Sequence, residues 1–212
     1  MSIDWRQVPS AWASRSYWIH GAKIRFFGED GDAHRYRPWL ADILDDLHPR
    51  KVVKKARQIG ASEIGLCEEL WLAATIPGIK LLHTMPRDKQ VSEFSAARID
   101  SVVDASPALD AMRAEPWNTG IKGFAHADGQ RSFLNIRSSW DSALGEGVDA
   151  DVVLLDEYDR MRPGVEDAFR ESLASSKLNF LRWFSTPTLP GVGIDALYER
   201  SDQRRWHVAC DA

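Results

Sequence analysis

The 212-residue sequence has little cysteine, no long apolar run and no excess of basic charge. Its two cysteines, Cys67 and Cys210, lie far apart, which excludes a disulfide framework and favours a reducing compartment. The N-terminus shows no apolar leader segment, and no stretch is long enough to cross a bilayer. These absences predict a cytoplasmic protein that does not use a membrane as a partner.

The formal net charge is −4, whereas an autonomous nucleic-acid-binding module usually carries a strong basic excess. This charge still allows a motor that touches DNA through a local patch, and short basic runs occur at 50–57 and 200–205. Arg87, Lys89 and Lys122 are candidates for a DNA-contacting surface, although ordinary solvated charge explains them equally well.

Short apolar stretches alternate with helical patterns along most of the chain. Residues 1–35 show little periodicity and are predicted to form a helical arm, and an irregular stretch is predicted around Pro107 and Pro116. The alternation predicts an α/β fold in three layers, with a mostly parallel central sheet and helices on both faces. Strands are predicted at 51–56, 79–84, 133–136, 152–155 and 178–184, and helices at 36–47, 62–76, 87–103 and 164–175.

One strand-to-helix segment partly matches the phosphate-binding loop G-x-x-x-x-G-K-[ST]. Gly60 and Ser62 agree with it, whereas Lys55 replaces its first glycine and Ala61 replaces its lysine. A phosphate cradle needs N–H groups at a helix N-terminus and a cation near the terminal phosphates. Lys55 or Arg57 could supply the cation that Ala61 cannot, and Ser62 could offer its hydroxyl to Mg²⁺. A basic, solvated turn explains this segment alone equally well.

Two carboxylates, Asp156 and Glu157, follow the apolar run at 152–155. A carboxylate at a strand tip can hold the shell of Mg²⁺, and a second one can deprotonate a water for attack on the γ-phosphate. We therefore assign Asp156 to the metal and Glu157 to the base. Ser185–Thr188 follows the next strand, where a simple Ser/Thr turn is the better explanation of that segment alone. Ligand sites of parallel sheets lie beyond the C-terminal strand ends, so we expect these segments at one edge.

Taken together, the motifs resemble the large terminase subunit of tailed phages, in its lambda-like branch. In that branch the phosphate-loop lysine stands at the start of the motif, as Lys55 does here. The resemblance covers nearly the whole chain and rests on the order and spacing of segments that are weak alone: Tyr-Arg-Pro-Trp at 36–39, Lys-Lys-Ala-Arg-Gln-Ile-Gly-Ala-Ser-Glu at 54–63, Thr-Met-Pro at 84–86, Asp-Glu-Tyr-Asp-Arg at 156–160 and Ser-Thr-Pro-Thr at 185–188.

The resemblance implies a P-loop ATPase core of the ASCE type at 36–190, followed at 191–212 by the start of a linker. It implies ATP and Mg²⁺ as cofactors, and a homo-oligomeric ring at the portal protein of a procapsid in the bacterial host cytoplasm. There, hydrolysis would drive double-stranded DNA inward, with a small terminase subunit helping to select the DNA. By position, it implies a nucleotide site made of Pro38, Trp39, Lys54, Lys55, Gln58, Gly60, Ala61, Ser62 and Glu63. It implies catalytic roles for Lys55, Arg57, Asp156 and Glu157, and a metal held by Ser62 and Asp156. It implies that Ser185, Thr186, Pro187 and Thr188 couple hydrolysis to movement.

The sequence departs from the family pattern in three places. No glutamine follows Pro38, and the loop at 143–147 lacks the arginine that acts on a neighbouring subunit, for which Arg137 is a substitute candidate. The chain ends at Ala212, where the family's nuclease domain would begin. We therefore expect no nuclease activity, and either a truncated chain or a natural single-domain relative.

Two alternatives remain at this point. A helicase-like DNA translocase core shares the phosphate loop and the acidic pair, but it usually needs a second motor domain. A catalytically silent nucleotide-binding module fits Ala61, but such a module has no need for a water-activating base at Glu157.

Overall fold

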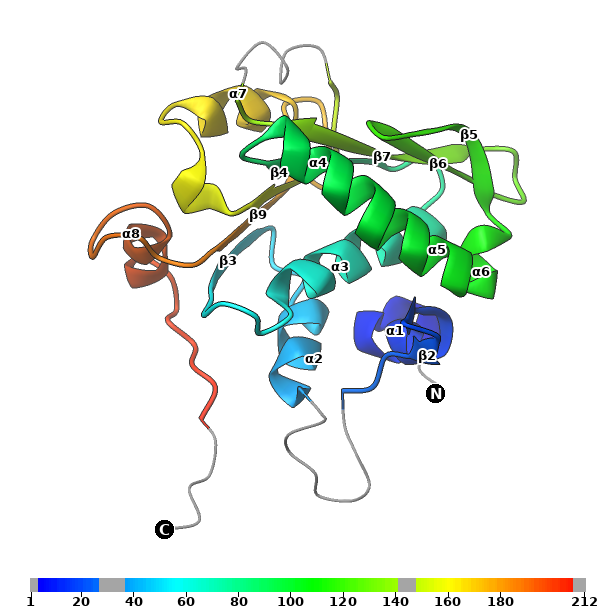
Figure 1. The fold of residues 1–212 in the computed structure, drawn as a ribbon, viewed down its shortest axis with the longest axis horizontal. Helices are drawn as coiled ribbons and strands as arrows, with labels where there is room; N and C mark the ends of the chain where they lie inside the picture. Colours follow the sequence, from blue (N-terminus) through cyan, green and yellow to red (C-terminus); the bar gives the residue numbers. More distant parts are fainter. Residues whose placement is uncertain (1–3, 27–36, 141–147, 208–212) are drawn as a thin grey trace.

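The computed structural model describes residues 4–26, 37–140 and 148–207. Within them, a seven-stranded sheet has helices packed on both faces (Figure 1). This arrangement confirms the predicted three-layer α/β fold. The strands run in the order β3-β9-β8-β4-β7-β6-β5, with the bounds β3 (Arg50–Lys54), β4 (Lys80–Met85), β5 (Arg113–Asn118), β6 (Ile121–Ala125), β7 (Arg131–Ser138), β8 (Val152–Asp156) and β9 (Phe180–Ser185).

The strands from β3 to β7 in this order are parallel, and β6 and β5 extend the sheet antiparallel. Although β9 comes last in the chain, it lies between β3 and β8. In register, Lys54 is opposite Ser185, and Asp156 is opposite Phe184. The C-terminal ends of β3, β9 and β8 therefore meet at one edge, which brings the three motif-bearing segments together.

Helices cover the two faces of the sheet unequally. β8 lies between the two layers and is buried along its whole length, as expected for a parallel strand covered on both faces. One face carries α1 (Pro9–Ser16), α2 (Pro38–Asp45), α3 (Ala61–Thr75) and the continuous stretch of α4 (Asp88–Phe94), η2 (Ser95–Asp100) and α5 (Ser101–Ala105). The other face carries only α7 (Val165–Glu171) and α8 (Ile194–Glu199) among the described α-helices.

The stretch around Pro107 and Pro116 differs from its prediction, because it forms the short helix α6 (Pro107–Asp110) and the hairpin β5–β6. The signal was hidden because β5 is a largely exposed edge strand, and Pro116 lies at a shift in its register. Proline is tolerated at such a place because no ladder N–H is needed there. The helix predicted at 164–175 also ends early, at Glu171, and turns follow it.

The N-terminal segment packs onto the same face as α2 and α3. It consists of a short 3-10 helix, η1 (Trp5–Gln7), α1, and the two-stranded hairpin β1 (Trp18–Ile19) and β2 (Ala22–Lys23). Trp12, Ala13 and Tyr17 are buried in one apolar cluster with residues of α2 and α3. Among the described residues, no helix has the length and apolar character needed to cross a membrane.

Candidate functional site

The loop between β3 and α3 turns sharply. Lys55 continues β3 by donating its N–H to the Ser185 carbonyl at 2.9 Å. The backbone is left-handed at Gln58 (φ 60°) and at Gly60 (φ 86°), which directly precedes α3. A Cβ on Gly60 would lie 2.8 Å from Arg37 Nη1, the tip of a long side chain that can move, so this position favours glycine mainly for its dihedral angle. Arg37, which sequence reasoning missed, brings a further cation to the loop.

The side chain of Lys55 lies at the junction of β3, α3 and β8. Its Nζ is 3.3 Å from Ser62 Oγ and 3.8 Å from Asp156 Oδ1. The Lys55 side chain is 10% exposed and that of Asp156 only 1%, and an unpaired charge at such a place would be costly. The first turn of α3 adds N–H groups without helical partners, and these favour an anion beside the ammonium.

The acidic pair occupies the tip of β8. Asp156 Oδ1 accepts the N–H of Glu157 at 3.0 Å. Glu157 has a φ of 59°, a left-handed conformation that costs a residue with a side chain about 1–2 kcal/mol. Its Oε2 lies 2.9 Å from Arg160 Nη1, at ion-pair distance but without hydrogen-bond alignment. Strained backbone clusters at functional sites, so the turn at Glu157 points to function independently of the motif.

The segment Ser185–Thr188 leaves β9 and lies against the turn that follows Glu157. Ser185 Oγ accepts the N–H of Asp159 at 3.1 Å, and Asp159 Oδ2 accepts the N–H and Oγ1–H of Thr188 at 2.9 and 3.1 Å. Sequence reasoning missed Asp159 as a functional residue, and its only signal was its place in the segment Asp156–Arg160. The structure therefore brings the acidic turn and the Ser185–Thr188 segment into direct contact.

Lys54, which the resemblance also implied in the nucleotide site, points elsewhere. Its Nζ forms an ion pair with Asp195 of α8 and lies 5.0 Å from the ring centroid of Tyr198. Neighbouring side chains of a strand point to opposite faces, so Lys55 reaches Ser62 while Lys54 does not. Arg57 and Gln58 are exposed on the loop.

Glu63 is engaged on the N-terminal side of α3. Its Oε1 accepts the hydroxyl of Tyr17 at 2.8 Å, and its Oε2 accepts Arg98 Nη1 at 2.7 Å. Burial, together with the charge of Glu63, raises the pKa of Tyr17 well above its usual value, which keeps the phenol protonated as the donor. Glu63 thus fixes the start of α3 to Tyr17, which directly follows α1, and to η2.

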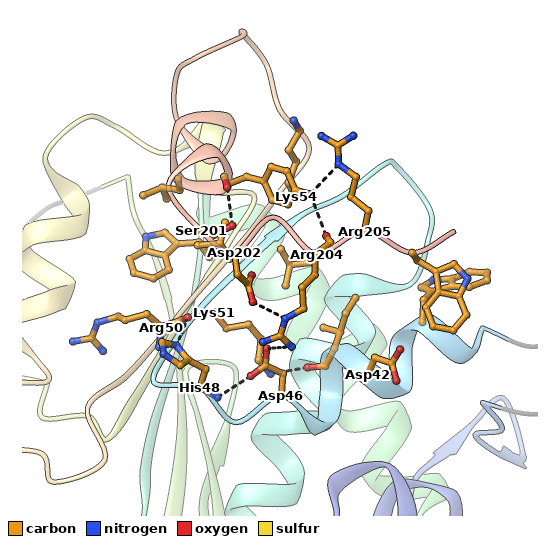
Figure 2. A pocket seen from close by; sticks show the side chains of 18 of the residues that line it. Asp42, Asp46, His48, Arg50, Lys51, Lys54, Ser201, Asp202, Arg204 and Arg205 are labelled. Atoms are coloured by element: carbon orange, nitrogen blue, oxygen red, sulfur yellow. Dashed lines mark hydrogen bonds and ion pairs between the residues drawn. The ribbon is translucent and has the colours of Figure 1, made fainter. Parts of the chain in front are cut away.

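A groove of about 1240 Å³ runs beside β3, between α2 and the segment that follows α8 (Figure 2). Lys54 and Ile59, on either side of the phosphate-loop turn, both line it. Trp39 of α2 also lines it, and its ring centroid lies 6.2 Å from that of Trp206. Trp39, proposed from the resemblance on the adenine side, therefore borders an open space next to the loop, and Pro38 begins the same helix.

Beneath the site, α3 and β4 share a buried ion pair. His83 Nδ1 lies 2.8 Å from Glu69 Oε2, and the two side chains are 0% and 1% exposed. Burial alone lowers the pKa of His83, but the carboxylate of Glu69 and, after it, Asp156 raise that pKa above its ordinary value. Burial raises the pKa of Glu69. A titratable pair therefore lies behind Asp156.

Two basic residues that the sequence singled out make contacts within the chain. Arg137 donates from Nη1 to the carbonyls of Gly120 and Ile136, and its role as a substitute for the missing arginine stays a prediction. Lys122 is 2% exposed and forms an ion pair with Asp100, so it cannot face DNA. Lys122 of β6 thus binds a carboxylate of the helix η2, and Arg137 of β7 binds neighbouring backbone carbonyls. The loop at 143–147 lies outside the described residues.

Comparison with known proteins adds to this geometry. The family model described as phage terminase large subunit gpA, ATPase domain, matches residues 29–212. The chain belongs to this terminase family. As a terminase ATPase domain, it is an enzyme domain that binds nucleotide, hydrolyses ATP and takes part in phage DNA packaging.

Solved terminase structures share the fold. The ATPase domain of the large terminase of Thermus phage P74-26 has a TM-score of 0.60 and 17% identity, over 78% of this chain and 71% of that domain. The large terminase of bacteriophage HK97 has a TM-score of 0.72 and 14% identity, over 98% of this chain but only 45% of its own. The terminase chain described here thus spans less than half of the HK97 protein. Among curated proteins, none matches it significantly.

Proposed function

We propose that this terminase ATPase domain binds ATP with Mg²⁺ where Lys55, Ser62 and Asp156 meet, and that hydrolysis there drives double-stranded DNA into a procapsid. The observation that carries the proposal is the position of the Lys55 ammonium, 3.3 Å from Ser62 Oγ and 3.8 Å from Asp156 Oδ1. This position supports the proposal that Lys55 takes the role of the lysine that the phosphate loop lacks at Ala61. Gly60 and Ser62 keep the roles they have in the standard motif.

The residues at this junction fit a hard divalent cation. Mg²⁺ prefers oxygen ligands, and in nucleotide sites it is held by one or two protein oxygens, waters and phosphate oxygens. The Ser62 hydroxyl and the Asp156 carboxylate lie near each other, because both are within 4 Å of the Lys55 ammonium. Together they offer two oxygen ligands to a Mg²⁺ ion bound beside that ammonium. When bound, Mg²⁺ would neutralise charge on the phosphates.

Each side chain then has a distinct task. The first turn of α3 and Lys55 hold the phosphates, because N–H groups and an ammonium converge there. Glu157 orients and deprotonates the attacking water, because the left-handed turn separates its carboxylate from the buried Asp156. Arg160 Nη1 lies 2.9 Å from Glu157 Oε2, so the guanidinium is a neighbour of the carboxylate that would act as the base.

The assembly follows from the family and not from the chain alone. We propose that several copies form a ring at the portal protein, that a small terminase subunit presents the DNA, and that the motor works in the bacterial cytoplasm. Arg87 and Lys89 are exposed at the start of α4, so they stay candidates for DNA contact. The groove beside Trp39 is the candidate site for the nucleoside.

Substitution of Lys55 and of Glu157 tests the site. With DNA and partner subunits present, Lys55→Ala and Glu157→Gln should each lower ATP turnover by about 10²–10³-fold, the usual effect of removing one group that stabilises the transition state. Equilibrium binding should separate them, because Lys55→Ala weakens nucleotide binding and Glu157→Gln retains it.

Lys80→Ala and Glu171→Gln are matched controls, since both side chains are exposed and lie away from this edge of the sheet. Near wild-type turnover in either site variant would remove the role given to that residue. Nucleotide binding by the wild-type protein without any turnover would favour the silent nucleotide-binding module.

A further inference from the structure

Asp159, two residues after Glu157, uses both carboxylate oxygens to hold the segment after β9. Oδ2 accepts two hydrogen bonds from Thr188, and Oδ1 accepts the N–H of Ile194, the first residue of α8, at 2.7 Å. The N–H of Asp159 itself donates to Ser185 Oγ at 3.1 Å. One residue therefore contacts the start and the end of the segment 185–194.

The backbone opposite Asp159 is shaped around its carboxylate. Gly193 has φ 60° and ψ −128°, a conformation that only glycine adopts readily. A Cβ at Gly193 would lie 2.5 Å from Asp159 Oδ1, so any larger residue would displace the carboxylate. The contact thus depends on two residues that lie far apart in the sequence.

The first turn of α8 is also tied to the opposite side of the nucleotide site. Asp195 accepts the N–H of Gly191 at 2.6 Å and forms the ion pair with Lys54. Lys54 directly precedes Lys55, so α8 is connected both to the turn that bears Glu157 and to the strand that bears Lys55.

The turn that carries Asp159 is closed by backbone hydrogen bonds. Arg160 donates its N–H to the Glu157 carbonyl at 2.9 Å, and Met161 donates to the Tyr158 carbonyl at 3.0 Å. These bonds close the 3-10 helix η4 (Tyr158–Arg160), which begins directly after the strained Glu157. If the backbone of Glu157 relaxes during the reaction cycle, Asp159 moves with it.

We infer that Asp159 is a positioning residue that transmits changes at Glu157 to the segment 186–193 and to α8, and so couples ATP hydrolysis to DNA movement. This inference rests on the proposed function of the site. Asp159 does not touch the nucleotide in this account; it acts through the hydrogen bonds to Thr188 and Ile194. Both oxygens must accept, so a carboxylate is needed and an amide, with one oxygen, can satisfy only one end of the bridge.

Asp159→Asn in the full packaging motor tests the inference. We expect ATP turnover without DNA to fall less than about threefold and the KM for ATP to stay near wild type, while base pairs packaged per ATP fall by about tenfold, within the range seen when a coupling residue is removed. A purely structural role would not change that ratio. Thermal unfolding of the variant would show that it folds.

Gly193→Ala should reproduce this uncoupling, because its Cβ displaces the same carboxylate. Gly129→Ala is the matched control: Gly129 also has a positive φ, 85°, but nothing lies within 4 Å of its added Cβ, and it lies outside the segment 186–193. Asp167→Asn, an exposed carboxylate on α7, controls for charge.

The combined variant Asp159→Asn/Gly193→Ala should be no worse than either single variant, because both break one contact. Packaging per ATP that is unchanged in Asp159→Asn, or additive losses in the double variant, would overturn the inference. Failure of the proposed site would look different, because Lys55→Ala and Glu157→Gln would then keep near wild-type ATP turnover.

Discussion

The sheet has two regions that use buried charge differently. In the phosphate half, formed by β3, β9 and β8, the pair of Lys55 and Asp156 lies at the C-terminal strand ends beside two left-handed turns. In the hairpin half, formed by β7, β6 and β5, Lys122 of β6 pairs with Asp100 of η2, and Trp117 Nε1 donates to the same carboxylate. The pair of Lys55 and Asp156 lies next to N–H groups of α3 that have no helical partner. The pair of Lys122 and Asp100 connects a strand to a helix instead.

The lesson is that burial and pairing alone do not mark a functional charge. Both lysines are at most 10% exposed. What distinguishes Lys55 is its place at the edge where parallel strands end and a helix begins. Substitutions in the two halves should therefore separate activity from stability.

The largest effect is expected from Asp156→Asn in the phosphate half. Removing this negative charge should lower Mg²⁺-dependent ATP turnover by about 10²–10³-fold, because charge stabilisation at the phosphates is lost. Steady-state turnover measured over a range of Mg²⁺ concentrations checks this. If turnover stays within a factor of a few of wild type at every concentration, Asp156 does not hold the metal.

The next largest effect is expected from Asp100→Asn in the hairpin half. It leaves Lys122 buried without its counter-charge, which should lower the free energy of unfolding by about 2 kcal/mol, less than for a fully buried pair because Asp100 is 32% exposed. Urea unfolding measures the change, and ATP turnover should be retained. A loss of turnover with unchanged stability would reverse the comparison between the halves.

The smallest effect is a pH dependence at β4, which lies between the two halves. Because the pKa of His83 is raised in the folded protein, its ion pair with Glu69 stabilises the fold fully below the unfolded pKa of about 6.5. That contribution is lost as pH rises through the folded pKa. The raised pKa of Glu69 gives the same sign.

Thermal unfolding as a function of pH checks this prediction. The unfolding temperature should fall from pH 6.5 upward in the wild type, and His83→Gln should flatten that part of the profile. A profile that rises over the same range would show that burial, and not Glu69, controls His83.

The sequence predicted the parallel strands and the main helices well, because the continuous apolar run of β8 and the amphipathic pattern of α2 are strong signals. It also predicted which segments meet at the sheet edge, since parallel strands end together. It could not choose between Lys54, Lys55 and Arg57, because that choice depends on which face of β3 each side chain occupies. The hairpin β5–β6 was missed because an exposed edge strand with Pro116 gives no alternation to read.

Other residues of the site depend on contacts between distant segments. Asp159 became visible only through Thr188 and Ile194, about thirty residues later in the chain. Arg37 became visible only because it lies against Gly60. Lys122 was misjudged because its sequence context shows charge but not burial.

A crystal structure with Mg²⁺ and a non-hydrolysable ATP analogue tests the central claim most directly. The account predicts Lys55 Nζ within hydrogen-bond distance of the β- or γ-phosphate oxygens, with Lys54 still paired to Asp195. A structure in which Lys54 or Arg57 contacts those oxygens, and Lys55 remains with Ser62 and Asp156 away from them, would contradict it.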